Sequence, residues 1–129
     1  EVVFLGPVPA ARRDEVLTNS DVGLVLFHPI PNHMRSEPNK LFEYVERGCA
    51  VLGSRLPRQL ELIEELSCGV AVQADDASQV IAVMREMLQA PDHWRQVGRD
   101  ARVRLERGGL YWDEEKGKLL GLYDEIGRA

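Results

Sequence analysis

The stretch NKLFEYVERGCAVL, residues 39–52, decides the fold. Its first part places Leu41, Tyr44 and Val45 at spacings of three and four, which predicts an amphipathic helix over residues 39–47. Its end, residues 50–52, is a short apolar run that is typical of a strand buried on both faces. A helix that leads directly into such a strand indicates a parallel α/β sheet.

The same alternation continues on both sides of this stretch. Apolar runs predict further strands at residues 2–5, 22–27 and 70–72. Helical spacing predicts helices over residues 9–18, 58–66, 78–88, 91–107 and 112–126, with Ser78 as the N-cap of the third of these. The expected fold class is therefore α/β: a Rossmann-like parallel sheet with helices on both faces and a helical tail.

Length and charge limit the functional class. The chain has 129 residues, enough for one domain, and 16 Lys and Arg against 21 Asp and Glu give a net charge of −5. A global basic surface for nucleic acid is therefore absent. Five arginines nevertheless crowd one segment, either as a solvated helix face or as a local basic patch: Arg95, Arg99, Arg102, Arg104 and Arg107. Cys49 and Cys68 lack metal-ligand spacing, and we expect buried, reduced thiols.

The helix that begins at Asn39 follows a long, proline-rich loop, residues 28–38. Open α/β sheets bind ligands at the carboxyl ends of their strands, and a helix N-terminus offers unpaired N–H groups to a phosphate. Lys40 adds a positive charge in the first turn, and Glu43 lies one turn beyond Asn39 on the same face. A carboxylate there can accept hydrogen bonds from two ribose hydroxyls. Alternatively, Lys40 and Glu43 form a plain surface ion pair.

Other residues in these loops invite chemical interpretations. His28 and His33 lack further ligands at metal-binding spacing, so they either line the cleft or are ordinary loop histidines. Asp75-Asp76 stands at a helix start, which favours capping. Ser54 lacks the G-x-S-x-G context of a nucleophile. No dinucleotide-binding or P-loop glycine motif occurs.

Several stretches resemble the glycosyltransferase family 4 group of GT-B enzymes. The stretch from Ser36 to Leu52 resembles the family's "PNKLFEY…G.PV" signature. The likeness covers essentially the whole chain, through Phe4-Leu5-Gly6-Pro7-Val8, Ser20-Asp21-Val22-Gly23-Leu24, Gly69-Val70-Ala71-Val72 and Leu110-Tyr111-Trp112-Asp113.

The resemblance assigns roles to individual residues. Glu43 resembles the second acid of the family's E-x7-E motif, which holds the donor ribose, and Val8 the position that faces the nucleobase. The backbone of Pro38, Asn39 and Lys40 resembles the turn that meets the pyrophosphate and the sugar. Ser36 and Leu41 belong to the same matched stretch and are placed with the donor-binding residues.

One position departs from the family's pattern. The first acid of the motif falls at Arg35, with Glu37 two residues later. Either Glu37 replaces that acid through a shifted loop, or sugar recognition differs in this protein.

The resemblance also implies an activity and its partners. Residues 1–129 would be an incomplete C-terminal donor-binding domain of a GT-B glycosyltransferase, a hexosyltransferase of the retaining type that uses a nucleotide-diphosphate sugar. The first strands and the N-terminal domain, which would bind a sugar or lipid-linked acceptor, would lie outside the chain. No cofactor, metal, nucleic-acid partner or catalytic residue is expected, and these residues alone would be inactive. Polysaccharide or glycolipid assembly in the cytoplasm, with peripheral contact at the inner membrane face, is the family-level expectation.

The family's sheet order carries a structural corollary. It places the missing strands between residues 2–5 and residues 22–27, so the first predicted strand would have no neighbour within this chain. We therefore expect a gap in the sheet or a rearranged pairing there. Two other functions stay open: a nucleotide-sugar epimerase of the same architecture, and a non-catalytic Rossmann-like binding module.

Overall fold

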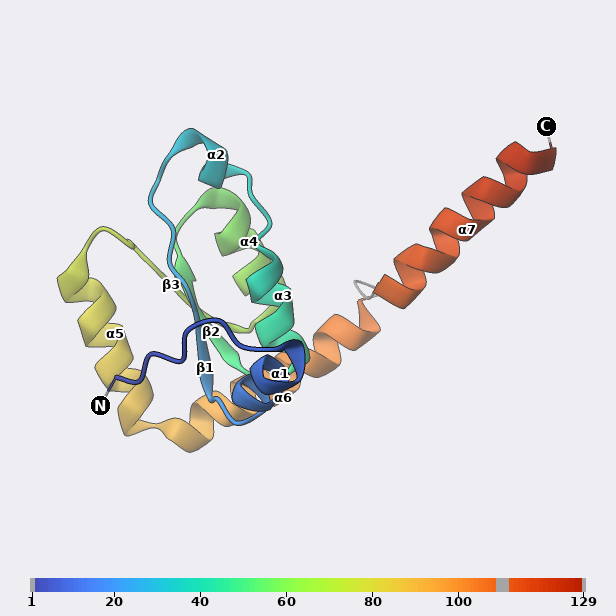
Figure 1. Cartoon of the computed structure of the whole chain (residues 1–129). Helices are drawn as coiled ribbons and strands as arrows, with labels where there is room; N and C mark the ends of the chain where they lie inside the picture. The colour runs from blue at the N-terminus through green and yellow to red at the C-terminus, as the bar shows by residue number, and fades with distance from the viewer. Residues whose placement is uncertain (1, 109–111, 129) are drawn as a thin grey trace.

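The computed structural model describes residues 2–108 and 112–128, the side chains of residues 112–114 excepted. Three parallel strands form one sheet in the order β1-β2-β3: β1 (Val22–Val25), β2 (Ala50–Ser54) and β3 (Gly69–Val72). In the register, Val22 pairs with Ala50, and Val51 pairs with Gly69. The predicted α/β class with a parallel sheet is confirmed (Figure 1).

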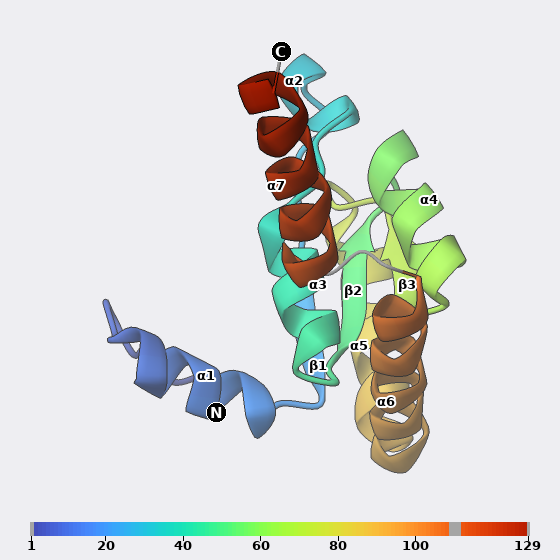
Figure 2. The same ribbon diagram turned by 90° about the vertical axis from the view of Figure 1, so that its right-hand side faces the viewer.

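Seven helices are described around this sheet. They are α1 (Ala10–Thr18), α2 (Pro31–Met34), α3 (Asn39–Glu46), α4 (Pro57–Leu66), α5 (Ala77–Gln89), α6 (Pro91–Arg107) and α7 (Trp112–Arg128). Figure 2 looks onto the face of the sheet that α3, α4 and α6 cover, with α5 behind the strands.

The core has one cluster on each face of the sheet. The larger cluster joins Val25 and Val51 to Leu41, Leu62 and Leu105 of the three covering helices. The smaller cluster lies on the other face of the sheet. There Leu52 and Val72 of the strands pack with Met87 of α5, and Trp94 packs against this cluster. Helices on both faces are thus confirmed, and β2 is buried along its whole length.

Two glycines allow the backbone elements to approach closely. A Cβ on Gly98 of α6 would lie 2.0 Å from the carbonyl oxygen of Gly48, and one on Gly69 would lie 1.8 Å from that of Val51. No side chain fits at either position without displacing backbone. These contacts set the distance of α6 from β2 and of β3 from β2.

The predicted strand at residues 2–5 is wrong. The segment forms no strand in the described structure, and it is solvent-exposed, with Val2 98% and Phe4 94% accessible. A strand needs a neighbour to satisfy its backbone groups, and this segment pairs with no strand of the described sheet. One edge of β1 is consequently unpaired within the described chain.

Other boundaries also shift. The loop over residues 28–38 contains the short helix α2, and β1 ends at Val25, two residues before the predicted end. Asp76, and not Ser78, caps α5: its Oδ1 accepts a hydrogen bond from the backbone N–H of Gln79 at 3.1 Å. Asp76 therefore has the capping role expected of the Asp75-Asp76 pair.

Both cysteines are free and buried, as predicted. Burial raises the pKa of Cys49 to about 11 and that of Cys68 to about 12. The Cys49 thiol points at the end of α1, where it donates to the carbonyl oxygen of Leu17 at 3.1 Å. These thiols are therefore protonated parts of the packing near neutral pH.

The helical tail is also confirmed. Helix α7 extends away from the sheet and its covering helices (Figure 1). Among the described helices, none combines the length and apolar character that crossing a bilayer requires.

Candidate functional site

The candidate site is the amino end of α3, which the chain reaches from the carboxyl end of β1. Pro38 precedes the helix, and no side chain caps it. The backbone N–H of Leu41 donates to the carbonyl oxygen of Pro38 at 2.9 Å, while the first turn contains no acidic residue. This helix end therefore presents positive backbone dipole at the ligand-binding edge of a parallel sheet.

The predicted residues around this end differ in accessibility. Asn39 and Lys40 are exposed, and Ser36 is partly exposed. Pro38 and Leu41 are buried, with Leu41 packed in the larger core cluster. Any contact of Pro38 or Leu41 with a ligand would therefore be through backbone atoms, because their side chains face the interior.

Glu43 lies one turn further along α3, and its side chain is 40% exposed. One carboxylate oxygen, Oε1, is 3.8 Å from Nη1 of Arg13 on α1. The side chain thus points out of the core toward a cation on a helix that is distant in sequence. A ligand hydroxyl has access to this carboxylate.

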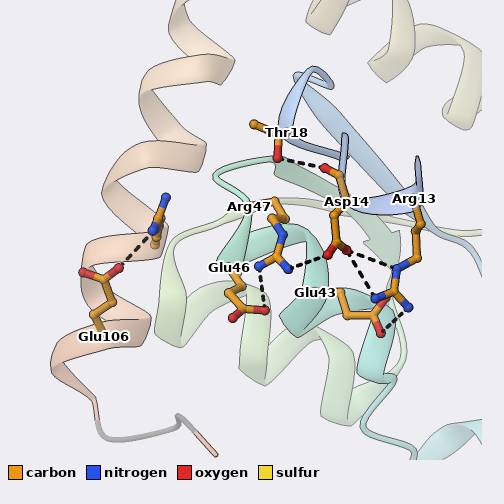
Figure 3. A network of polar contacts seen from close by, with 8 residues as sticks. Arg13, Asp14, Thr18, Glu43, Glu46, Arg47 and Glu106 are labelled. Carbon is orange, nitrogen blue, oxygen red and sulfur yellow. Dashed lines mark hydrogen bonds and ion pairs between the residues drawn. The ribbon is translucent and has the colours of Figure 1, made fainter. Parts of the chain in front are cut away.

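A chain of ion pairs continues from this contact and ties α1 to α3 (Figure 3). Asp14 Oδ1 is 3.3 Å from Nη2 of Arg13, and its Oδ2 is 3.4 Å from Nη2 of Arg47. Arg47 Nη1 lies 3.1 Å from Oε2 of Glu46. Helix α1 has no buried residue, so these contacts and the Cys49 hydrogen bond hold it against the body.

Glu37 is engaged at the neighbouring helix. The Nε of Arg58, near the start of α4, donates to Glu37 Oε1 at 2.6 Å, and Arg58 Nη1 donates to Glu61 Oε2 at 3.1 Å. Hydrogen bonding to Glu37 and then to Glu61 raises the pKa of Arg58. Glu37 therefore borders the site as one partner of an ion pair.

Val8 stands apart from the other predicted residues. It lies in the exposed, irregular segment that leads into α1. The predicted residues from Ser36 to Glu43 thus lie along one loop and helix, whereas Val8 lies in a separate segment of the chain.

Sequence reasoning missed a group of hydrogen bonds that connects the carboxyl ends of β1 and β2. The Ser54 hydroxyl accepts from the backbone N–H of Phe27 at 2.6 Å, and the Ser54 N–H donates to Gln59 Oε1 at 3.1 Å. Both side chains are buried, and Gln59 Nε2 has no partner among the described residues. Ser54 thus supports the loop that leads to the site, in keeping with its lack of a nucleophile motif.

The two histidines of the loop contact each other. Nδ1 of His33 is 2.9 Å from the carbonyl oxygen of His28, and the ring of His33 lies 4.8 Å from that of Phe27. Within the described residues, no group of three or more metal-ligating side chains assembles here or elsewhere.

Comparison with protein-family models, with curated proteins and with solved structures finds no match to this chain.

Proposed function

We propose that this chain is the donor-binding half of a GT-B glycosyltransferase, and that it binds a nucleotide-diphosphate sugar at the start of α3. The observation that carries the proposal is the arrangement of three accessible side chains. Asn39 and Lys40 are exposed in the first turn, and the half-exposed Glu43 follows one turn later. The resemblance of residues 36–52 to the family's signature supports the same assignment.

In this proposal the α3 N-terminus stabilises the departing nucleoside diphosphate. Backbone N–H groups of the first turn and the ammonium group of Lys40 would offset the negative charge that develops as the sugar leaves. Glu43 would accept hydrogen bonds from the two ribose hydroxyls. Charge-assisted hydrogen bonds of this kind fix the nucleoside while the diphosphate is held at the helix end.

Glu37 would meet the transferred sugar only after rearrangement of its ion pair with Arg58. The sugar hydroxyls would then compete with the guanidinium group for the same carboxylate. Both side chains are partly exposed, and solvent screens the attraction between them, so a bound donor can displace this ion pair.

The remaining parts of the proposal concern the full-length protein. Retaining, metal-independent transfer to a sugar or lipid-linked acceptor would need an N-terminal domain and the family's phosphate-binding basic residues. The proposal assigns no general base to this chain and gives it donor binding only.

The test is calorimetric titration of the full-length protein with a panel of nucleotide-diphosphate sugars, comparing wild type with Glu43→Gln. The substitution removes the negative charge and weakens both ribose hydrogen bonds. We expect affinity to fall at least tenfold, since each hydrogen bond to a charged group contributes about 1.5–3 kcal/mol.

Glu46→Gln is the matched control, because it makes the same change on the same helix at a side chain paired with Arg47. Equal losses in both variants, or undiminished binding in Glu43→Gln, would contradict the proposal. Product analysis by NMR with the donor that binds separates glycosyl transfer from epimerisation of the sugar.

A further inference from the structure

Four arginines surround a hollow at the amino end of β1, whereas the site proposed above lies beyond the carboxyl end of this strand. Arg47 comes from the end of α3, and α6 contributes Arg95, Arg99 and Arg102. The hollow has a volume of about 390 Å³, and its other lining residues are Thr18, Asn19, Ser20, Asp21 and Gly48. Since Ser20 and Asp21 precede β1 whereas the α3 N-terminus follows it, this arginine hollow is separate from the site proposed above.

Basic side chains outnumber acidic ones in the lining, although the chain as a whole has a net charge of −5. Four guanidinium groups face one lining carboxylate, that of Asp21. Arg95 donates hydrogen bonds to both oxygens of this carboxylate, from Nε to Oδ1 at 2.7 Å and from Nη2 to Oδ2 at 3.1 Å. The bidentate pair fixes α6 against the start of β1 and uses up the single negative charge of the lining.

Arg99 and Arg102 keep hydrogen-bonding capacity for a ligand. Nη2 of Arg99 donates to the neutral amide oxygen of Gln96 at 2.7 Å, and Arg99 forms no ion pair with the described residues. Arg102 forms an ion pair with Glu106 through its Nε, at 3.1 Å, while its two Nη groups have no hydrogen-bond partner among the described residues. The two arginines are three residues apart on α6, so their guanidinium groups share one helix face.

The carbonyl groups at the end of α1 have hydrogen-bond partners other than these arginines. Helix C-termini carry partial negative charge from unpaired carbonyl groups. At the end of α1, the side chains of Thr18, Asn19 and Ser20 donate to the backbone carbonyl oxygens of Asp14, Glu15 and Val16, at 2.8, 2.8 and 2.7 Å. Arg99 has no carboxylate partner among the described residues, and Arg102 has one, Glu106.

We propose that the arginine hollow binds a phosphate-bearing anion, with Arg99 and Arg102 as its ligands and Arg47 and Arg95 as its charged walls. The planar guanidinium group matches the geometry of a phosphate and binds it through two parallel hydrogen bonds. Asp21 and the carboxylates around Arg47 hold the wall arginines in place before the anion arrives. The phosphate belongs either to a soluble polyphosphate or to a lipid headgroup.

The first experiment titrates the chain with inorganic pyrophosphate by calorimetry at low ionic strength. The variant Arg99→Gln/Arg102→Gln is compared with Arg85→Gln/Arg107→Gln, which makes the same change of charge at exposed helical arginines outside the hollow. We expect the first variant to bind at least tenfold more weakly and the second to bind within twofold of wild type. Absence of binding by wild type, or equal loss in both variants, overturns the proposal for a soluble anion.

The second experiment identifies the source of the phosphate. The same three proteins are sedimented with vesicles of phosphatidylcholine containing phosphatidic acid. Binding that is lost only in Arg99→Gln/Arg102→Gln assigns the hollow to a lipid headgroup, and pyrophosphate binding without vesicle binding assigns it to a soluble anion. If wild type binds neither, the arginine hollow is no anion site. Circular dichroism melting of each variant confirms that the fold is retained.

Discussion

Nη1 of Arg13 lies 3.8 Å from Oε1 of Glu43, so a cation from α1 faces the carboxylate that we expect to hold a ribose. The two residues are on different helices, and α1 has no buried side chain of its own. Docking of α1 and the electrostatic environment of Glu43 are therefore linked through one exposed contact. The guanidinium group of Arg13 would also attract the phosphates of a bound diphosphate.

Arg13→Gln should weaken binding of a nucleoside diphosphate about threefold to tenfold at low ionic strength. The lost guanidinium charge would no longer attract the phosphates, and the difference should shrink at high salt because exposed charges are screened. Arg12→Gln is the control, since Arg12 pairs with Glu15 within α1, at 2.7 Å. Titration of both variants at two salt concentrations checks this, and equal behaviour of the two would show that α1 has no part in the site.

Gly98→Ala should lower the free energy of unfolding by about 1–3 kcal/mol or more. The added Cβ would lie 2.0 Å from the Gly48 carbonyl oxygen, and backbone must move to make room. Urea unfolding measures the loss. Gly117→Ala provides the contrast: nothing lies within 4 Å of its added Cβ, so helix propensity predicts a gain of about 0.5–1 kcal/mol for α7. A mild effect at Gly98 would mean that α6 packs less closely than described.

Asp76→Ala should cost about 1 kcal/mol of stability, because Asp76 Oδ1 accepts the N–H of Gln79 at the start of α5. Ser78→Ala should change stability little, since Ser78 lies inside the helix and alanine favours helix. Thermal melts of the two variants distinguish the observed cap from the one that the sequence predicts. The reverse order of stabilities would restore Ser78 as the cap.

Alkaline pH should destabilise the fold through the buried thiols. The ordinary thiol pKa of 9.0 rises to about 11 at Cys49 and about 12 at Cys68, mainly through burial. Above pH 9 the unfolded chain therefore binds fewer protons than the folded one, and the free energy of unfolding falls as pH rises.

The size of this effect should be on the order of 1 kcal/mol per thiol between pH 8 and pH 10.5. Urea unfolding under reducing conditions at both pH values measures it, with Cys49→Ala/Cys68→Ala as the reference. The variant should be less stable at pH 8 but should lose less stability on going to the higher pH. Parallel losses in the two proteins would rule out the thiols as the cause.

The sheet and its helices were predictable from the sequence because their signals are local. The apolar run at the start of β2 and the spacing of Leu41 and Val45 specify a strand and a helix without reference to the rest of the chain. The segment at residues 2–5 has an equally strong apolar signal, yet a strand also requires a partner. Local pattern could not show whether one was present.

The sequence predicted which consecutive residues form the candidate site, but not which residues from other elements contact them. Loop and helix connect Ser36 to Glu43 directly, so their proximity follows from the sequence. Arg13 reaches Glu43 from another helix, and Gln59 reaches Ser54 from the start of α4. The arginine hollow likewise joins Arg47 to α6 across a long sequence separation. Such contacts depend on tertiary packing, which no short motif encodes.

Burial of β2 between two neighbouring strands also determines how the molecule comes apart. Its backbone groups are paired on both edges, and its side chains are covered on both faces, so its amide protons should be the last to exchange with solvent. Helix α1, which has no buried residue, should open before β2 and independently of it. Amide exchange should therefore be slow in β2 and fast in α1, and the Arg13–Glu43 contact joins α1 to a helix that packs on β2.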